Sequence, residues 1–140
     1  MKFRSVALAI SGALFFMNPA AAVAAPVKYL CELTSHSRFG WIPKKALYVL
    51  DEAAGKATAF DPYIRHVGAE QAKDLALKKI GAKRYSLKYT LNGLPAQGNM
   101  KVIATYVVRL NLKTQRVTLE ADIHRADFTQ RGTGLCKLIK

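Results

Sequence analysis

Three alternating segments decide the fold, and they lie within residues 84–124, RYSLKYTLNGLPAQGNMKVIATYVVRLNLKTQRVTLEADIH. Residues 84–91, 100–113 and 116–124 each alternate apolar and polar side chains. This period of two predicts antiparallel strands with one buried face, because a helix would scatter the apolar side chains around its circumference. The predicted inward set is Tyr85, Leu87, Tyr89, Leu91, Met100, Val102, Ala104, Tyr106, Val108, Leu110, Leu112, Val117, Leu119, Ala121 and Ile123.

The flanking sequence extends this sheet in both directions. Four further segments are predicted to be strands, namely residues 27–34, 44–50, 57–60 and 134–139. Residues 68–80 fit two alternatives, because alanines recur there at helical spacing whereas Leu75 and Leu77 alternate with polar neighbours as in a strand. We therefore expect an all-β fold with at most one short helix, arranged as a single antiparallel barrel or curved sandwich of seven or eight strands.

The composition and the two cysteines agree with one small domain. The chain has 140 residues, and 51% of them are hydrophobic, which supplies a core and excludes a disordered chain. Cys31 and Cys136 lie near the two ends of the predicted domain. In an oxidising compartment such cysteines pair, and closing a loop of about 100 residues stabilises a fold by about 4 kcal/mol. A Cys31–Cys136 disulfide would place the first and last strands side by side.

The N-terminal segment has the layout of a secretory signal peptide. Lys2 and Arg4 precede the apolar run 6–16, and small residues follow at 20–25. We predict cleavage after Ala24, so that residues 1–24 are the signal peptide and residues 25–140 the single β-barrel-like domain. A membrane-spanning helix needs about 20 apolar residues, and no later segment supplies them. The expected product is an exported bacterial protein, periplasmic or secreted.

Residues suited to catalysis or metal binding are few and scattered. Ser35-His36-Ser37 lacks the G-x-S-x-G pattern that exposes a nucleophilic serine. Glu120 and Asp122 share the polar face of one strand beside basic residues, which is more typical of solvated ion pairs than of a catalytic pair. The histidines, which lack the paired spacing of a zinc site, are His36, His66 and His124. We expect a non-enzymatic protein without metal or cofactor.

The basic surplus is the strongest functional signal. Lys and Arg number 22 against 9 Asp and Glu, a formal charge of +13 that becomes +11 once Lys2 and Arg4 are removed. The predicted anion-binding residues are Lys78, Lys79, Lys83, Arg84, Lys88, Lys101, Arg109, Lys113 and Arg116. In a paired sheet their fields would sum and attract a polyanion, in the periplasm lipopolysaccharide, anionic phospholipid or acidic glycan. The alternative is a solubilising surface; nucleic acid is not an expected physiological partner, because the protein is exported.

Two apolar features have open interpretations. Tyr85, Tyr89 and Tyr106 on the predicted inner face fit either a filled core or the lining of a ligand cavity, and a barrel of this size favours a filled core. Trp41-Ile42-Pro43 is predicted to plug one end of the barrel. Ile103 and Val107 fall on the otherwise polar outer face, where either residues 68–80 cover them or they mark a contact surface.

Three short motifs carry a resemblance to a known family. The chain resembles periplasmic inhibitors of C-type lysozyme in Tyr29-x-Cys31, in Gly81-x-x-Arg84-Tyr85 and in the late Cys136. It differs at Ile80, where that family has a serine. The resemblance covers about a tenth of the chain and implies a small disulfide-closed β-barrel. Basic lysozymes would be repelled by a basic partner. The resemblance nevertheless gives the alternative function, a periplasmic protein-interaction module or enzyme inhibitor. Its contact surface would include Ile103, Val107 and the loops around Trp41.

Overall fold

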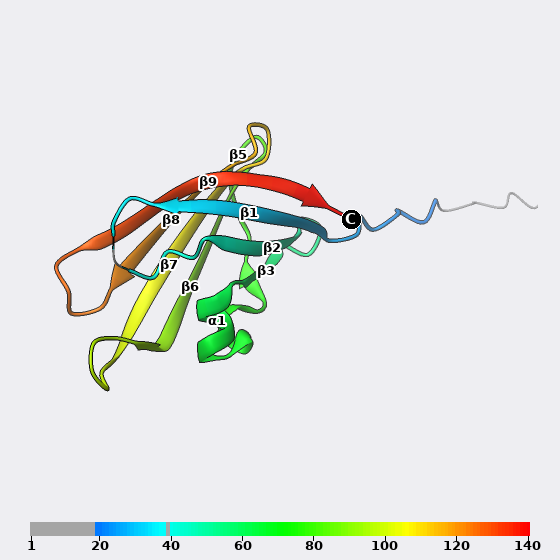
Figure 1. Cartoon of the computed structure of the whole chain (residues 1–140). Coiled ribbons are helices and arrows are strands. Elements are labelled where there is room, and N and C mark those ends of the chain that lie inside the picture. Colours follow the sequence, from blue (N-terminus) through cyan, green and yellow to red (C-terminus); the bar gives the residue numbers. More distant parts are fainter. Residues whose placement is uncertain (1–18, 39) are drawn as a thin grey trace, which may run out of the picture.

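Nine antiparallel strands form one sheet in the computed structural model, which describes residues 19–38 and 40–140 (Figure 1). The strands are β1 Val27–Ser35, β2 Lys45–Asp51, β3 Lys56–Phe60, β4 Leu75–Ala76, β5 Lys78–Gly81, β6 Arg84–Pro95, β7 Lys101–Asn111, β8 Arg116–Ile123 and β9 Thr129–Ile139. Their order in the sheet is β4-β3-β2-β1-β9-β8-β7-β6-β5. The predicted all-β fold is confirmed, and the count exceeds seven or eight because residues 68–80 contribute the short β4 and β5.

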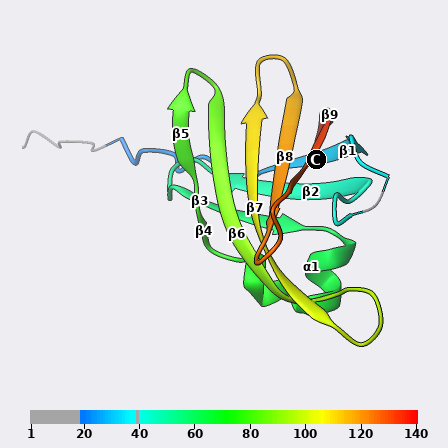
Figure 2. The same cartoon turned by 90° about the vertical axis from the view of Figure 1, so that its left-hand side faces the viewer.

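The pairing of the first strand with the last strand joins the two halves of the sheet. β1 pairs antiparallel with β9 along its length, and Cys31 stands directly opposite Cys136. The predicted disulfide joins these two residues across 105 positions of sequence. At the other side, β4 and β5 are the two edges of the sheet and are separated in the chain by Leu77 alone. The sheet therefore curls into a nearly closed barrel (Figure 2).

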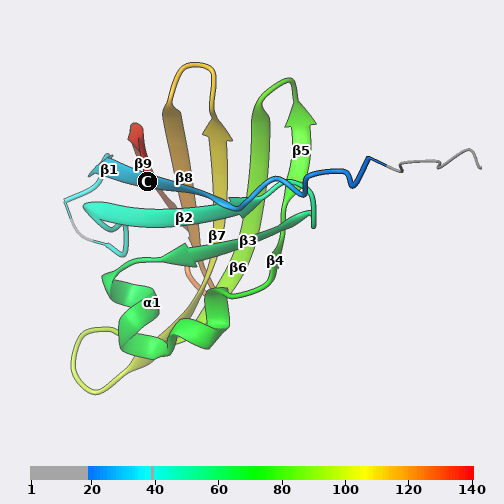
Figure 3. The same cartoon turned by 90° about the vertical axis from the view of Figure 1, so that its right-hand side faces the viewer.

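A short helix packs against the barrel between β3 and β6 (Figure 3). Helix α1, Pro62–Val67, begins at Asp61, whose Oδ1 accepts hydrogen bonds from the backbone N–H groups of Tyr63 at 2.7 Å and Ile64 at 3.0 Å. Proline at the first helical position suits this start, since its missing N–H would lack a partner within the helix. Ile64 is fully buried, so α1 extends the core.

Residues 68–80 are neither one helix nor one strand, the two alternatives that the sequence left open. A 3₁₀ turn at Ala69–Ala72 leads into β4, and β5 follows directly. The α-helix lies just before this segment, because Gly68, with φ +117°, ends it. The segment does not cover Ile103, which is 39% exposed.

The barrel is filled by its own side chains. The predicted inward set of β6, β7 and β8 is buried or half-buried, and Tyr89 stacks on Tyr106 with ring centroids 5.1 Å apart. Met100 is the exception: it is 65% exposed, because it lies in the turn before β7 rather than in the strand. The filled-core interpretation therefore holds for Tyr89 and Tyr106.

The loop between β1 and β2 closes one end of the barrel, as predicted for Trp41-Ile42-Pro43. The backbone N–H of Trp41 donates to Oε1 of Gln130 at 2.8 Å, and the Tyr106 hydroxyl donates to the Trp41 carbonyl at 2.9 Å. The preceding residue is Gly40, and a Cβ there would displace the end of the Gln130 side chain. Gly40 also has φ +144°, which disfavours any other residue.

Most of the predicted signal peptide, residues 1–24, lies outside the described residues. Its residues 1–18 are not among the described residues, and residues 19–26 precede β1 without regular structure. Within 19–38 and 40–140, helices are too short or too polar to cross a membrane.

Candidate functional site

The nine predicted anion-binding residues share one stretch of sequence without an acid. Residues 75–119 contain these nine Lys and Arg and neither Asp nor Glu. Asp74 and Glu120 flank the stretch. It comprises β4 to most of β8, so the structure determines which of the nine cations meet.

Two hairpins bring eight of the nine cations to one end of the barrel. The β5–β6 and β7–β8 hairpins lie side by side, with their turns at the same end (Figure 2). A hydrogen bond of 2.9 Å from the N–H of Leu112 to the carbonyl of Lys83 joins the two turns. We call this group the cationic end; its members are Lys78, Lys79, Lys83, Arg84, Lys88, Arg109, Lys113 and Arg116.

Local turn chemistry places the two lysines at the hairpin tips. In the β7–β8 turn, Oδ1 of Asn111 accepts from the backbone N–H groups of Lys113 at 3.1 Å and Thr114 at 3.2 Å. In the β5–β6 turn, Lys83 has φ +54°, a left-handed conformation that tightens the connection. Both lysine side chains are exposed.

Strand register puts four further cations on the outer face. Arg84 of β6 and Arg116 of β8 both pair with Asn111, which lies between them on β7. Two strand spacings separate their backbones by about 10 Å. Two pairs further along the strands, Arg109 stands opposite Ser86 of β6, and Lys88 follows on the same face of β6. These side chains are exposed and close enough for their fields to add.

The three remaining predicted residues, Lys78, Lys79 and Lys101, lie at different places on the sheet. Lys78 pairs with Ser86 and so shares the outer face, whereas Lys79 pairs with the inward Tyr85 at the sheet edge. Lys101 begins β7, eight residues from Arg109, which is about 26 Å along a strand. Lys101 therefore lies away from the other eight cations, because alternation predicts the face of a residue and not its position along the barrel; its role in anion binding stays a prediction.

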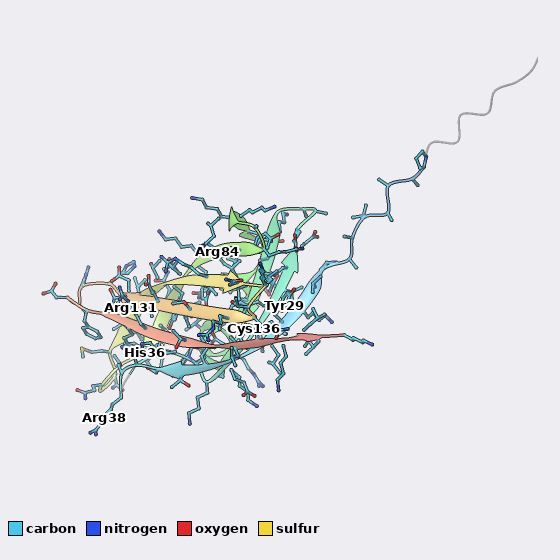
Figure 4. The ribbon with its side chains drawn as sticks, turned by 90° about the horizontal axis from the view of Figure 1, so that it is seen from above. Tyr29, His36, Arg38, Arg84, Arg131 and Cys136 are labelled. Atoms are coloured by element: carbon cyan, nitrogen blue, oxygen red, sulfur yellow. A yellow bond between two sulfur atoms is a disulfide. The ribbon has the colours of Figure 1, made fainter. Side chains whose placement is uncertain are left out.

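Glu120 borders the cationic end and is shared by two arginines. Oε2 of Glu120 lies 3.1 Å from Arg109, and Oε1 lies 3.4 Å from Arg131 of β9. Figure 4 labels Arg131 among the side chains drawn as sticks. One carboxylate between two guanidinium groups leaves the border positively charged. Arg131 was missed by sequence reasoning, because the last strand was predicted to begin at 134 whereas β9 begins at Thr129.

A tyrosine and a glutamate meet at the inner side of this end. The Tyr85 hydroxyl donates a hydrogen bond to Oε2 of Glu52, which lies in the β2–β3 turn. That bond to the carboxylate, together with burial, raises the pKa of Tyr85 to about 12. Glu52 is an exposed residue of that turn, so one acid lies at the inner side of this end.

The three histidines considered for catalysis or metal binding lie on separate parts of the fold. His36 contacts Thr133 at 3.0 Å, and His124 contacts Thr105 at 2.8 Å. His66 lies on α1 and is exposed. Across the described part of the chain, no three His, Cys, Asp or Glu side chains converge on a position suited to a metal.

Comparison with known proteins adds no assignment. No family model, no curated protein and no solved structure matches the chain. The resemblance to lysozyme inhibitors predicts a disulfide-closed β-barrel, which is the observed fold. An inhibitory function stays a prediction.

Proposed function

We propose that the protein is an exported, non-enzymatic binding protein whose cationic end recognises an anionic component of the bacterial envelope. Lipopolysaccharide, anionic phospholipid and acidic glycan share the required chemistry, a dense array of phosphates or carboxylates. The disulfide across Cys31 and Cys136 suits an oxidising compartment such as the periplasm.

One observation carries this proposal: eight cations meet at the turns and adjoining strand ends of two neighbouring hairpins, within residues 75–119, which contain no acid. A surface that serves only solubility usually mixes both signs of charge. Here the acids lie at the border, where Glu120 is already paired with Arg109 and Arg131. The unbalanced field favours a partner that carries several negative charges.

Attachment of this kind depends on ionic strength. At about 0.1 M salt the screening length is about 10 Å, similar to the spacing between Arg84 and Arg116, and at about 1 M it falls to about 3 Å. Binding to an anionic partner should therefore weaken steeply as salt is added.

The test is binding of the disulfide-bonded protein to lipopolysaccharide and to phosphatidylglycerol vesicles at low salt. Replacing the tip residues by Lys83→Glu and Lys113→Glu should weaken binding at least about tenfold, since each basic side chain near an anionic surface contributes separately. These residues lie in exposed turns, so the barrel should stay folded.

A matched control carries the same change of charge elsewhere. Lys101→Glu with Arg125→Glu removes two positive charges and adds two negative ones away from the hairpin tips. This variant should bind within about twofold of the natural protein. Equal losses in both variants, or no binding to any of these anions at low salt, would contradict the proposal.

A further inference from the structure

The outer face of β3, β2, β1 and β9 carries a group of apolar side chains among its polar ones. Leu30 of β1 pairs with Leu47 of β2, and Leu47 pairs with Phe60 of β3, so one apolar row crosses three strands. This row lies outside the barrel, because the neighbouring Ala46 and Tyr48 are buried in the core. We call the face the apolar wall; its members are Leu30, Leu47, Val49, Phe60, Leu135 and Ile139.

Several side chains of the apolar wall are open to solvent. Phe60 is 42% exposed and Leu135 is 61% exposed. A shallow hollow of about 290 Å³ lies beside Leu30, Leu47 and Phe60. Phe60 on β3 and Leu135 on β9 are separated by β2 and β1, where the half-buried Leu47 and Leu30 lie between them. Contiguous apolar groups mark surfaces that contact another body, whereas isolated apolar residues are ordinary.

Basic side chains surround and interrupt the apolar wall. Lys28 lies between Val49 and Ile139 in one row, and Lys137 stands beside Leu30 in the next. Lys45 follows in the third row, where its partner Glu32 lies 3.8 Å from it in an exposed ion pair. A lysine stem packs on apolar surface while its ammonium group reaches an anion, so the two chemistries act together.

We propose that the apolar wall docks the protein onto the surface of an anionic lipid bilayer. A bilayer supplies both a negative headgroup layer for the lysines and an apolar layer for Phe60 and Leu135. A second copy of the chain is a poorer occupant, because it would place two positively charged rims face to face.

The apolar wall adjoins the cationic end, so both can contact one membrane. Leu135 of β9 pairs directly with Arg116 of β8. The inference rests on the proposed function and takes the anionic component to be a lipid. It adds an apolar contribution to membrane binding that high salt does not remove.

The test uses the disulfide-bonded protein and vesicles of phosphatidylglycerol and phosphatidylethanolamine, sedimented at low salt and at about 1 M NaCl, where charge attraction is largely screened. We expect a fraction of the protein to stay bound at high salt. Phe60→Thr with Leu135→Thr should lower that salt-resistant partition coefficient about tenfold or more, because apolar burial drives it.

Two equally exposed apolar residues elsewhere provide the matched control. Met100 is 65% exposed and Ile103 is 39% exposed, close to the values for Leu135 and Phe60. Met100→Thr with Ile103→Thr removes a similar apolar surface away from the wall and should leave the partition coefficient unchanged. Equal losses in the two variants, or complete release of the natural protein at high salt, would overturn the inference.

A gain-of-signal variant keeps the test informative if the threonine variant unfolds. Leu135→Trp should show a blue-shifted fluorescence and quenching by brominated lipids, whereas Ile103→Trp should show neither. Absence of quenching at position 135 would overturn the inference. So would a dimer in solution that Phe60→Thr with Leu135→Thr dissociates, since the wall would then bind a second copy.

These outcomes separate the two proposals. Low-salt binding that depends on Lys83 and Lys113, with no dependence on the wall, would support the proposed function and refute the docking. Salt-resistant binding that depends on Phe60 and Leu135, but is insensitive to the tip lysines, would support the docking and refute the cationic end.

Discussion

The outer surfaces of the two sides of the barrel differ, although their inner faces are alike. In β6, β7 and β8 the outward positions include the basic cluster with Arg84, Lys88 and Arg109, whereas in β1, β2 and β3 they include the apolar row Leu30, Leu47 and Phe60 among polar side chains. Both sides send alternate residues into the same core. Packing constrains the inner faces alone, so the outward contrast needs a reason other than folding. We assign that reason to two modes of contact with an anionic envelope, one by charge and one by apolar docking.

The two sides also differ in how their strands meet. Hairpins with short turns connect β6 to β7 and β7 to β8, so these pairings are local in sequence. The pairing of β1 with β9 joins residues about a hundred positions apart, and the disulfide lies within it. Long-range pairing costs more chain entropy, and the covalent link offsets that cost.

The largest expected effect comes from removing that link. Replacing Cys31 and Cys136 by alanine should lower the free energy of unfolding by about 4 kcal/mol, because the unfolded chain regains the entropy of a long loop. Urea denaturation measures this loss. Hydrogen exchange should show that amides of β1 and β9 lose protection before those of β6 to β8. Equal loss across the barrel would remove the distinction between local and long-range pairing.

A smaller effect on stability is expected from removing the hydroxyl of one buried tyrosine on each side of the barrel. The Tyr106 hydroxyl on β7 donates to the Trp41 carbonyl, so Tyr106→Phe should cost about 1 kcal/mol and leave that carbonyl without this donor. The Tyr48 hydroxyl on β2 has no hydrogen-bond partner among the described residues. Tyr48→Phe should therefore change stability by about 0.5 kcal/mol or less. Thermal unfolding of both variants tests the pair, and a larger loss for Tyr48→Phe would contradict it.

Local patterns predicted the cationic side well and the apolar wall poorly. Alternation identified the inward residues of β6 to β8, because a short hairpin fixes the register between neighbouring strands. It misplaced Met100, which lies in the turn before β7, and it did not indicate that Lys101 lies far along β7 from the hairpin tips. The helix start at Asp61-Pro62 was readable from capping chemistry but was missed.

The apolar wall could not be read from the sequence, because its members come from four strands. Leu30, Leu47 and Phe60 form a row only once the registers of β1, β2 and β3 are known. Those registers depend on tertiary packing and on the β1–β9 closure. Arg131 was missed because the last strand was predicted to begin at 134, and its ion pair with Glu120 of β8 depends on the pairing of these two strands.

The most direct measurement of the central claim is an amide chemical-shift titration with the phosphorylated core oligosaccharide of lipopolysaccharide, which carries charge but no acyl chains. The account predicts saturable shifts at residues 78–88 and 109–116, which weaken with salt, and little change along the apolar wall. Shifts confined to other parts of the barrel, or no shifts at low salt, would contradict the assignment of the cationic end as the anion-binding site.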